Sequence, residues 1–149
     1  MGILRPKHKT VRVRVGKISA QIDVLLAPLI KMLWQNKIMT SNSCQENRPS
    51  IAWIQFPTPF DAINFLNVVA ALPSKKQLKN YQFWDTLYGR MTREGQFGEW
   101  EYKCHCRNEG ESYGVVDFNF AISLRFPHAD LASVVLAFED PERLKRIRV

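Results

Sequence analysis

The chain of 149 residues lacks several features that define large classes of protein. No uninterrupted apolar run reaches the roughly 18 residues that a membrane-spanning helix needs, so no membrane partner is expected. The first residues, Met1 to Lys7, contain no apolar stretch of the kind a secretory signal has. Cysteine is scarce and odd in number, at three residues, which argues against a disulfide framework and predicts a reducing, cytoplasmic location.

Signatures of catalysis and cofactor binding are lacking as well. The segment from Gly95 to Gly98 has neither the Lys-Ser/Thr pair nor the strand–helix setting of a phosphate-binding loop. The neighbouring carboxylates Glu94, Glu99 and Glu101 are expected to face solvent along a loop and a strand. We therefore expect a binding protein that is not an enzyme and that uses no cofactor.

Positive charge is abundant, but it lies at the two ends of the chain. The net charge is +7, yet residues 1–22 hold six basic residues and no acid, and residues 143–149 hold four basic residues and no acid. The rest of the chain has a small excess of acids. A clustered positive field attracts polyanions, so this distribution predicts binding of nucleic acid or another polyanion. The alternative is that charged ends only keep the protein soluble.

Alternation of apolar and polar residues predicts a first strand over Thr10–Val15. Its valines form one side and are expected to face a core, whereas Arg12 and Arg14 form the other side. Asp23 is a suitable N-cap for the densely apolar helix that follows and begins near Ala27.

Two more strands and a second helix are expected before residue 73. A short strand is predicted around 38–41, a polar loop over 42–49, and a strand over 50–56. Thr58 and Pro59 have the residue types of a helix N-cap and first turn, and this helix should end near Leu72.

The second half begins with an irregular segment over 74–98 and continues with two alternating strands. The first, over 99–107, is expected to turn four residues inward: Trp100, Tyr102, Cys104 and Cys106. The second, over 115–126, is expected to pack one apolar face on the core: Val116, Phe118, Phe120, Ile122, Leu124 and Phe126. Asp130 is expected to cap a final helix over 131–138.

These elements predict an α+β fold in a single domain, 1–149. Their order over 10–72 resembles the split β-α-β unit of ferredoxin-like domains, with a β-α-β-β-α core. An added β-hairpin and C-terminal helix occupy 99–139, and a basic tail occupies 140–149. The resemblance implies an antiparallel sheet with helices on one face and the other face open.

A second resemblance covers residues 23–56. An acid precedes an apolar helix that contains Leu33-Trp34, and then come Ser43-Cys44-Gln45-Glu46-Asn47 and a strand. This pattern resembles short, uncharacterised bacterial and phage α+β proteins. The resemblance carries no activity, but it implies a phage or mobile-element accessory, such as an inhibitor of a host defence or nucleic-acid-handling protein.

The open sheet face is the predicted nucleic-acid-binding site. Basic side chains there would neutralise phosphates, and an exposed aromatic would stack on a base. The predicted contacts are Arg12, Arg14, Trp53, Lys103, His105 and Arg107, with Gln55, Asn119 and Arg125 on the same face. The alternative is a solvated face, or one that the segment 74–98 covers.

Two other candidate sites follow from residue chemistry. The aromatic residues Tyr81, Trp84 and Tyr88 are the predicted contacts for a partner protein, because aromatics dominate binding hot spots. The polar loop is the predicted site for a small ligand or nucleotide, through Asn42, Ser43, Cys44, Gln45 and Glu46.

Neither a metal site nor a catalytic cysteine is expected. In Cys104-His105-Cys106, alternation places the two thiols on the face opposite the imidazole, so one ion cannot take all three. A nucleophilic Cys44 would need a base, and His8, His105 and His128 stand in no pairing motif.

Overall fold

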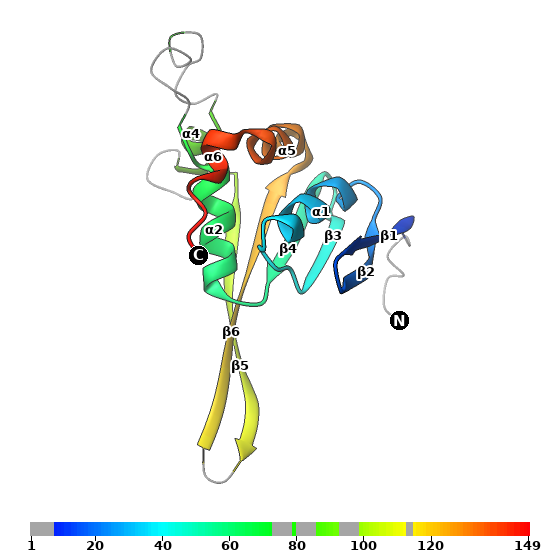
Figure 1. Ribbon diagram of the computed structural model, residues 1–149, viewed down its shortest axis with the longest axis vertical. Helices are drawn as coiled ribbons and strands as arrows, with labels where there is room; N and C mark the ends of the chain where they lie inside the picture. The colour runs from blue at the N-terminus through cyan, green and yellow to red at the C-terminus, as the bar shows by residue number, and fades with distance from the viewer. Residues whose placement is uncertain (1–7, 73–78, 80–85, 93–98, 113–114) are drawn as a thin grey trace.

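The computed structural model describes residues 8–72, 79, 86–92, 99–112 and 115–149 (Figure 1). It describes their side chains as well, except those of Thr92, 107–112 and 115–118. The strands are β1 (Thr10–Val15), β2 (Ile18–Asp23), β3 (Asn42–Arg48), β4 (Ile51–Phe56), β5 (Glu101–Ser112) and β6 (Val115–Pro127). The helices are α1 (Ala27–Gln35), α2 (Pro59–Val69), α4 (Leu87–Thr92), the 3-10 turn η3 (His128–Asp130), α5 (Leu131–Glu139) and α6 (Pro141–Leu144). None of the helices in this part of the chain is long and apolar enough to cross a membrane.

The strands form two antiparallel sheets, which confirms the α+β class. One sheet is the β1–β2 hairpin, and the other has four strands in the order β3-β4-β6-β5. The ferredoxin-like order is not confirmed, because β1 pairs with β2 along its whole length, from Thr10↔Asp23 to Val15↔Ile18. Gly16 opens the two-residue turn between them with φ +58°, a conformation that glycine adopts without a steric penalty.

The prediction of a strand around 38–41 is wrong, because the strand begins later in the chain, at Asn42 of β3. Lys37, with φ 60°, ends α1 in a left-handed conformation, and the Ile38 N–H donates back to Leu33 O at 2.9 Å. The Met39 N–H donates to Asp61 Oδ1 at 2.9 Å. The backbone N–H groups of Ile38 and Met39 thus bond to the end of α1 and to the start of α2, so they do not pair with a neighbouring strand.

The expectations for β4 and the start of α2 are confirmed. Ala52, Ile54 and Phe56 are fully buried on one face of β4. The Thr58 hydroxyl accepts the Asp61 N–H at 3.1 Å, as an N-cap does. The helix ends at Val69, slightly before the predicted end.

The main core lies between the four-stranded sheet and the helices that cover one of its faces (Figure 1). Aromatic rings fill its centre: Phe65 lies 5.2 Å from Phe56 and 5.7 Å from Phe138, between ring centroids. Trp100 stacks on Phe126 at 4.7 Å. Val13 and Ile22 of the hairpin belong to the same buried cluster, so the hairpin packs on the body through its apolar face.

The strands β5 and β6 continue past the sheet as a projecting two-stranded ribbon (Figure 1). The pairing of β6 with β4 covers only Ile122 to Pro127. The prediction that Tyr102, Cys104 and Cys106 face the core is wrong, since Tyr102 is 61% exposed and both cysteines are exposed. Cys106 lies opposite Phe120 in the ribbon, whereas Tyr102 and Cys104 lie on the edge strand β5 of the sheet itself. Phe120 is 49% exposed, while Val116 and Phe118 lie in the ribbon, where side chains are outside the described set.

Asp130 occupies the N-cap position of α5, but its side chain makes no capping hydrogen bond there. It is buried, accepts the Trp100 Nε1–H at 2.9 Å and pairs with Arg90, which also pairs with Glu99. Burial is the largest influence on the pKa of Asp130 and raises it, against the lowering effects of the Trp100 hydrogen bond and of Arg90. Burial alone would lower the pKa of Arg90, but its contacts with the two carboxylates raise it instead. The carboxylate that was expected to cap a helix instead joins α4, the start of β5 and η3.

We expect Asp130→Ala to lower the free energy of unfolding by about 3–5 kcal/mol, because it leaves a buried indole N–H and a partly buried guanidinium without their acceptor. Urea denaturation followed by circular dichroism measures this loss. Glu99→Ala is the matched control, since it removes the other carboxylate of Arg90 from an exposed position and should cost less than about 1 kcal/mol. Equal effects of the two variants would contradict the role given to Asp130.

Candidate functional site

The β1–β2 hairpin has one apolar and one polar face. By register the polar face carries six side chains: Thr10, Arg12, Arg14, Ser19, Gln21 and Asp23. Arg12 and Arg14 are exposed, and Arg12 Nη1 donates to Ser19 Oγ at 2.7 Å. Val13 is buried and Val15 partly buried, but Val11 is 44% exposed, so the expected core-facing valine side is confirmed only in part. Both guanidinium groups lie on the opposite, solvent side, as the alternation predicts.

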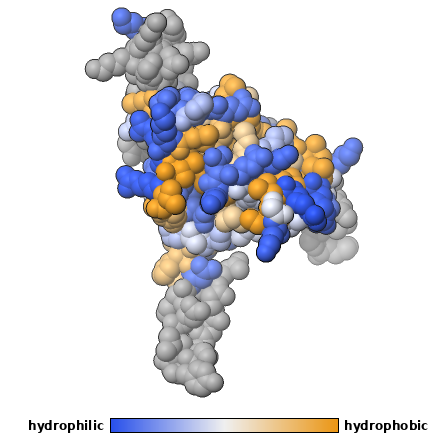
Figure 2. Space-filling view, in the orientation of Figure 1, coloured by the Kyte–Doolittle hydropathy of each residue, from blue (hydrophilic) through white to orange (hydrophobic). Residues whose placement is uncertain are grey.

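Positive charge on the hairpin is not matched by acid. Lys9, Arg12, Arg14 and Lys17 are exposed, and none of them forms an ion pair among the described residues. The one acid of the hairpin, Asp23, accepts the Gln45 N–H at 2.8 Å. Figure 2 shows hydrophilic side chains gathered over this part of the molecule.

The face of the four-stranded sheet opposite the helices holds another part of the predicted site. The register places Trp53 beside Arg125, and Lys103 and His105 follow on β5. The Arg125 guanidinium lies over the Trp53 ring at 5.9 Å, and His105 Nε2 is 3.0 Å from Ser123 Oγ. Arg12 and Arg14 are not in this sheet, which corrects the single continuous sheet that the sequence predicted.

An acidic residue and a polar atom without a hydrogen-bond partner among the described residues also lie on this sheet face. Arg48 Nη2 lies 2.6 Å from Glu101 Oε2 in an exposed ion pair, so part of the positive charge is compensated. The buried Trp53 Nε1 has no hydrogen-bond partner among the described residues. Arg107 continues along β5 into the ribbon, where its side chain is outside the described set.

The predicted ligand loop, Asn42 to Glu46, is not a loop but most of strand β3. The pairing of β3 with β4 is irregular between Cys44 and Arg48, and Gln45 lies at this bulge. Gln45 donates its N–H to Asp23, accepts the Leu25 N–H at 2.9 Å through Oε1, and contacts His128 Nε2 through its carbonyl. These polar groups connect the hairpin, the start of α1 and the end of β6.

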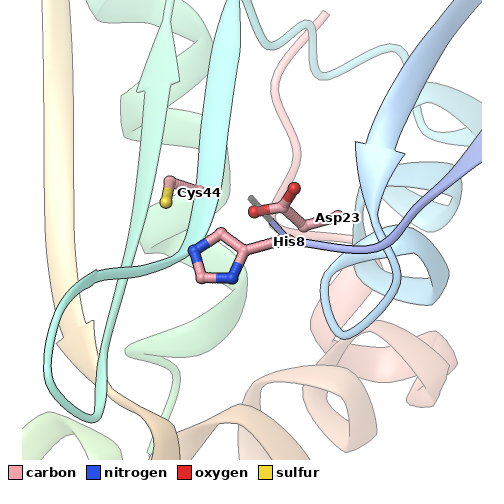
Figure 3. Close-up of side chains that lie close together, drawn as sticks. All are labelled: His8, Asp23 and Cys44. Atoms are coloured by element: carbon pink, nitrogen blue, oxygen red, sulfur yellow. The ribbon is translucent and has the colours of Figure 1, made fainter. Parts of the chain in front are cut away.

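Three side chains with reactive or metal-binding atoms converge at the same place (Figure 3). His8 precedes β1, Asp23 ends β2, and Cys44 lies on β3; one ligand atom from each lies within 4.8 Å of the other two. Asp23 belongs to the polar face of the hairpin, and the pairing of Cys44 with Trp53 assigns Cys44 to the open face of the sheet. The two faces therefore meet at this cluster.

Sequence reasoning found only part of this cluster. His8 is one of three histidines that could serve as a base for Cys44, and nothing in the local sequence distinguishes it from His105 and His128. Asp23 was expected to cap α1, whereas the N-cap position belongs to Leu26 and has no side-chain cap. Recognising the β1–β2 hairpin in the sequence would have brought these residues together, because β2 places Asp23 opposite Thr10 and so near His8.

The remaining predicted contacts are described only in part. Tyr81 and Trp84 lie outside the described residues, and Tyr88 on α4 is 38% exposed.

The register keeps Cys104 and Cys106 on the face of β5 opposite His105, as alternation predicts.

The basic C-terminal segment packs against the body of the protein and is not a free tail. Asn64 of α2 donates to Arg148 O at 3.0 Å and accepts the Arg148 N–H at 2.9 Å. Arg143 and Lys145 pair with Asp140 and Glu142, so part of the charge of this segment is compensated.

Comparison with known proteins adds nothing to these observations. No protein-family model, curated protein or solved structure matches the chain. The resemblance to short bacterial and phage proteins stays an expectation, and function has to be inferred from the chemistry of the surface.

We expect Asp23→Ala to lower the free energy of unfolding by about 1.5–3 kcal/mol, because the Gln45 N–H loses a charged acceptor in a partly buried setting. Asp23→Asn keeps an acceptor oxygen and should lose less. Glu46→Ala, which removes an exposed acid next to Gln45, should change stability by about 0.5 kcal/mol or less. Thermal and urea unfolding measure all three, and an Asp23→Ala protein as stable as Glu46→Ala would contradict the link between the sheets.

Proposed function

We propose that the protein binds nucleic acid, without catalysis, through the polar face of the β1–β2 hairpin and the adjoining open face of the four-stranded sheet. The observation that carries this proposal is the set of four exposed basic residues on the hairpin that have no carboxylate partner among the described residues. Cations held in this way neutralise phosphates and release condensed counterions, which is the main source of affinity for a polyanion.

The position of Asp23 strengthens the electrostatic argument. A carboxylate on the polar face of the hairpin would ordinarily lower its positive potential. Here the carboxylate is turned to the Gln45 N–H at 2.8 Å, at the end of the hairpin away from Arg14. Asp23 keeps its negative charge in this hydrogen bond, but it lies at the Thr10 end of the hairpin, so it lowers the potential around Arg14 less than a carboxylate beside Arg14 would.

Trp53 supports a preference for single strands. It is half-buried, shares its face with Lys103 and His105, and already stacks with one planar cation, Arg125. An aromatic ring between basic groups is the usual surface for an unpaired base. Because the ion pair between Arg48 and Glu101 compensates charge on this face, the hairpin supplies the larger part of the affinity.

A protein partner is the second candidate. Tyr102 on β5 and Phe120 on β6 expose large rings, and exposed aromatics favour protein contacts. An accessory that inhibits a host nucleic-acid-handling or defence protein would fit such a surface. Recovery of a stoichiometric protein partner, with no binding to any oligonucleotide, would favour this candidate over the first.

We expect the double variant Arg12→Ala/Arg14→Ala to bind a labelled single-stranded oligonucleotide at least tenfold more weakly in fluorescence anisotropy at about 50 mM salt. Two lost phosphate contacts should also reduce the slope of log K against log salt by about 1.4, since each contact contributes about 0.7 for a single strand.

Lys31→Ala/Lys37→Ala is the matched control for this experiment. It removes the same charge from two exposed positions on and just after α1, on the side of the sheet that the helices cover. We expect affinity to fall by less than a factor of about three, through the general field alone. An equal loss in both double variants would show that net charge, and not the hairpin, determines binding.

Trp53→Leu should distinguish single strands from duplexes. Loss of one stacked base costs about 1–3 kcal/mol of single-strand binding, whereas paired bases in a duplex are not free to stack. Lys103→Ala is the comparison, because a lost phosphate contact weakens both substrates alike. Equal weakening of single strands and duplexes by Trp53→Leu would contradict a stacking role.

A further inference from the structure

The cluster of His8, Asp23 and Cys44 has a different chemistry from the basic surface around it. We propose that these three side chains bind one Zn²⁺ ion. This inference does not depend on nucleic-acid binding, because it follows from the donor atoms and their positions alone.

The donor set suits zinc. A thiolate, an imidazole nitrogen and a carboxylate oxygen are the three ligand types that zinc takes in proteins, at about 2.3, 2.0 and 2.1 Å respectively. The thiolate and the carboxylate carry two negative charges, which neutralise the charge of the ion. Hard cations such as Mg²⁺ and Ca²⁺ prefer all-oxygen sites, so the Cys44 sulfur disfavours them.

The geometry also favours an ion over a catalytic triad. In a nucleophile–base–acid triad the imidazole separates the other two groups, so the nucleophile and the acid lie roughly 6–8 Å apart across two hydrogen bonds and a ring. Here the ligand atoms of Cys44 and Asp23 lie within 4.8 Å of each other as well as of His8. Figure 3 shows the three side chains grouped around a common space. Ligands of a tetrahedral ion lie about 3.3–3.8 Å apart, so small side-chain movements complete the site.

The surrounding structure already holds two of the ligands. The Gln45 N–H fixes Asp23 through Oδ2 at 2.8 Å, which is how an outer hydrogen bond orients a ligating carboxylate. Cys44 is held in the pairing of β3 with β4, opposite Trp53. His8 is followed by Lys9, whose carbonyl accepts the Val24 N–H at 3.0 Å, so the backbone next to His8 is tied to the end of β2.

An ion at this position would join three separate segments: the segment before β1, the end of β2 and strand β3. It would thus stabilise the attachment of the hairpin to the four-stranded sheet. Three protein ligands leave the fourth position of a tetrahedral zinc ion to water or another ligand.

Cobalt substitution in the untagged, reduced, full-length protein tests the proposal first. We expect one equivalent of Co²⁺ to give a thiolate charge-transfer band in the near ultraviolet and strong visible bands of tetrahedral geometry, and Zn²⁺ to abolish both. In the wild-type protein, Zn²⁺ should also protect Cys44 from alkylation, measured by mass spectrometry, and leave Cys104 and Cys106 reactive. This second readout needs no variant, so it holds even if a variant folds poorly.

Variants identify the ligands. Cys44→Ser should lose the charge-transfer band, and His8→Ala should weaken Zn²⁺ binding at least tenfold in a competition titration against a chromophoric chelator. The matched controls are Cys104→Ser/Cys106→Ser and His105→Ala, which change the same residue types on β5 and should bind as the wild type does. Absence of the band in the wild-type protein, or its loss in the Cys104/Cys106 variant with retention in Cys44→Ser, would overturn the proposal.

Discussion

The hydrogen bonds of Gln45 decide how the two sheets of this protein meet. At the bulge of β3 its N–H reaches the Asp23 carboxylate and its side-chain oxygen accepts the Leu25 N–H, so the end of β2 and the entry to α1 are both held against the edge strand. The position of the β1–β2 hairpin follows from this contact together with the burial of Val13 and Ile22. Without it, a two-stranded hairpin would be marginally stable by itself.

The electrostatic character of the surface depends on the same arrangement. Val13 and Ile22 on the apolar side of the hairpin belong to the core, and Arg12 and Arg14 on its other side remain in solvent. Asp23, the one acid of the hairpin, lies at its Thr10 end and accepts the Gln45 N–H. Basic residues such as Arg90 and Arg143 are instead partly buried and paired with acids. Burial even lowers the pKa of Arg143.

The long strand β6 shows how one pattern can have two structural meanings. Its alternation is continuous, yet Leu124 and Phe126 are fully buried whereas Phe120 is half exposed. β4 lies beside β6 only from Ile122 to Pro127, and Leu124 and Phe126 fall in this range. Beyond that, the same face of the strand belongs to the ribbon. Alternation assigns a side chain to a face, and the packing of other elements decides whether that face is core or surface.

Local chemistry determined a substantial part of this fold from the sequence alone. Three features were predictable, because each depends on residues within one turn or one strand of each other: the solvent side of β1, the buried face of β4, and the Thr58 cap with Pro59 at the start of α2. Tertiary structure alone decided the rest. The hairpin strand β2, the shift of strand to β3, the role of Asp130 and the convergence of His8, Asp23 and Cys44 all depend on partners distant in sequence. Asp23 and Asp130 are residue types that cap helices well. Their carboxylates instead accept a backbone N–H and a buried indole N–H elsewhere, because an unpaired buried donor costs more free energy than a helix end that water can reach.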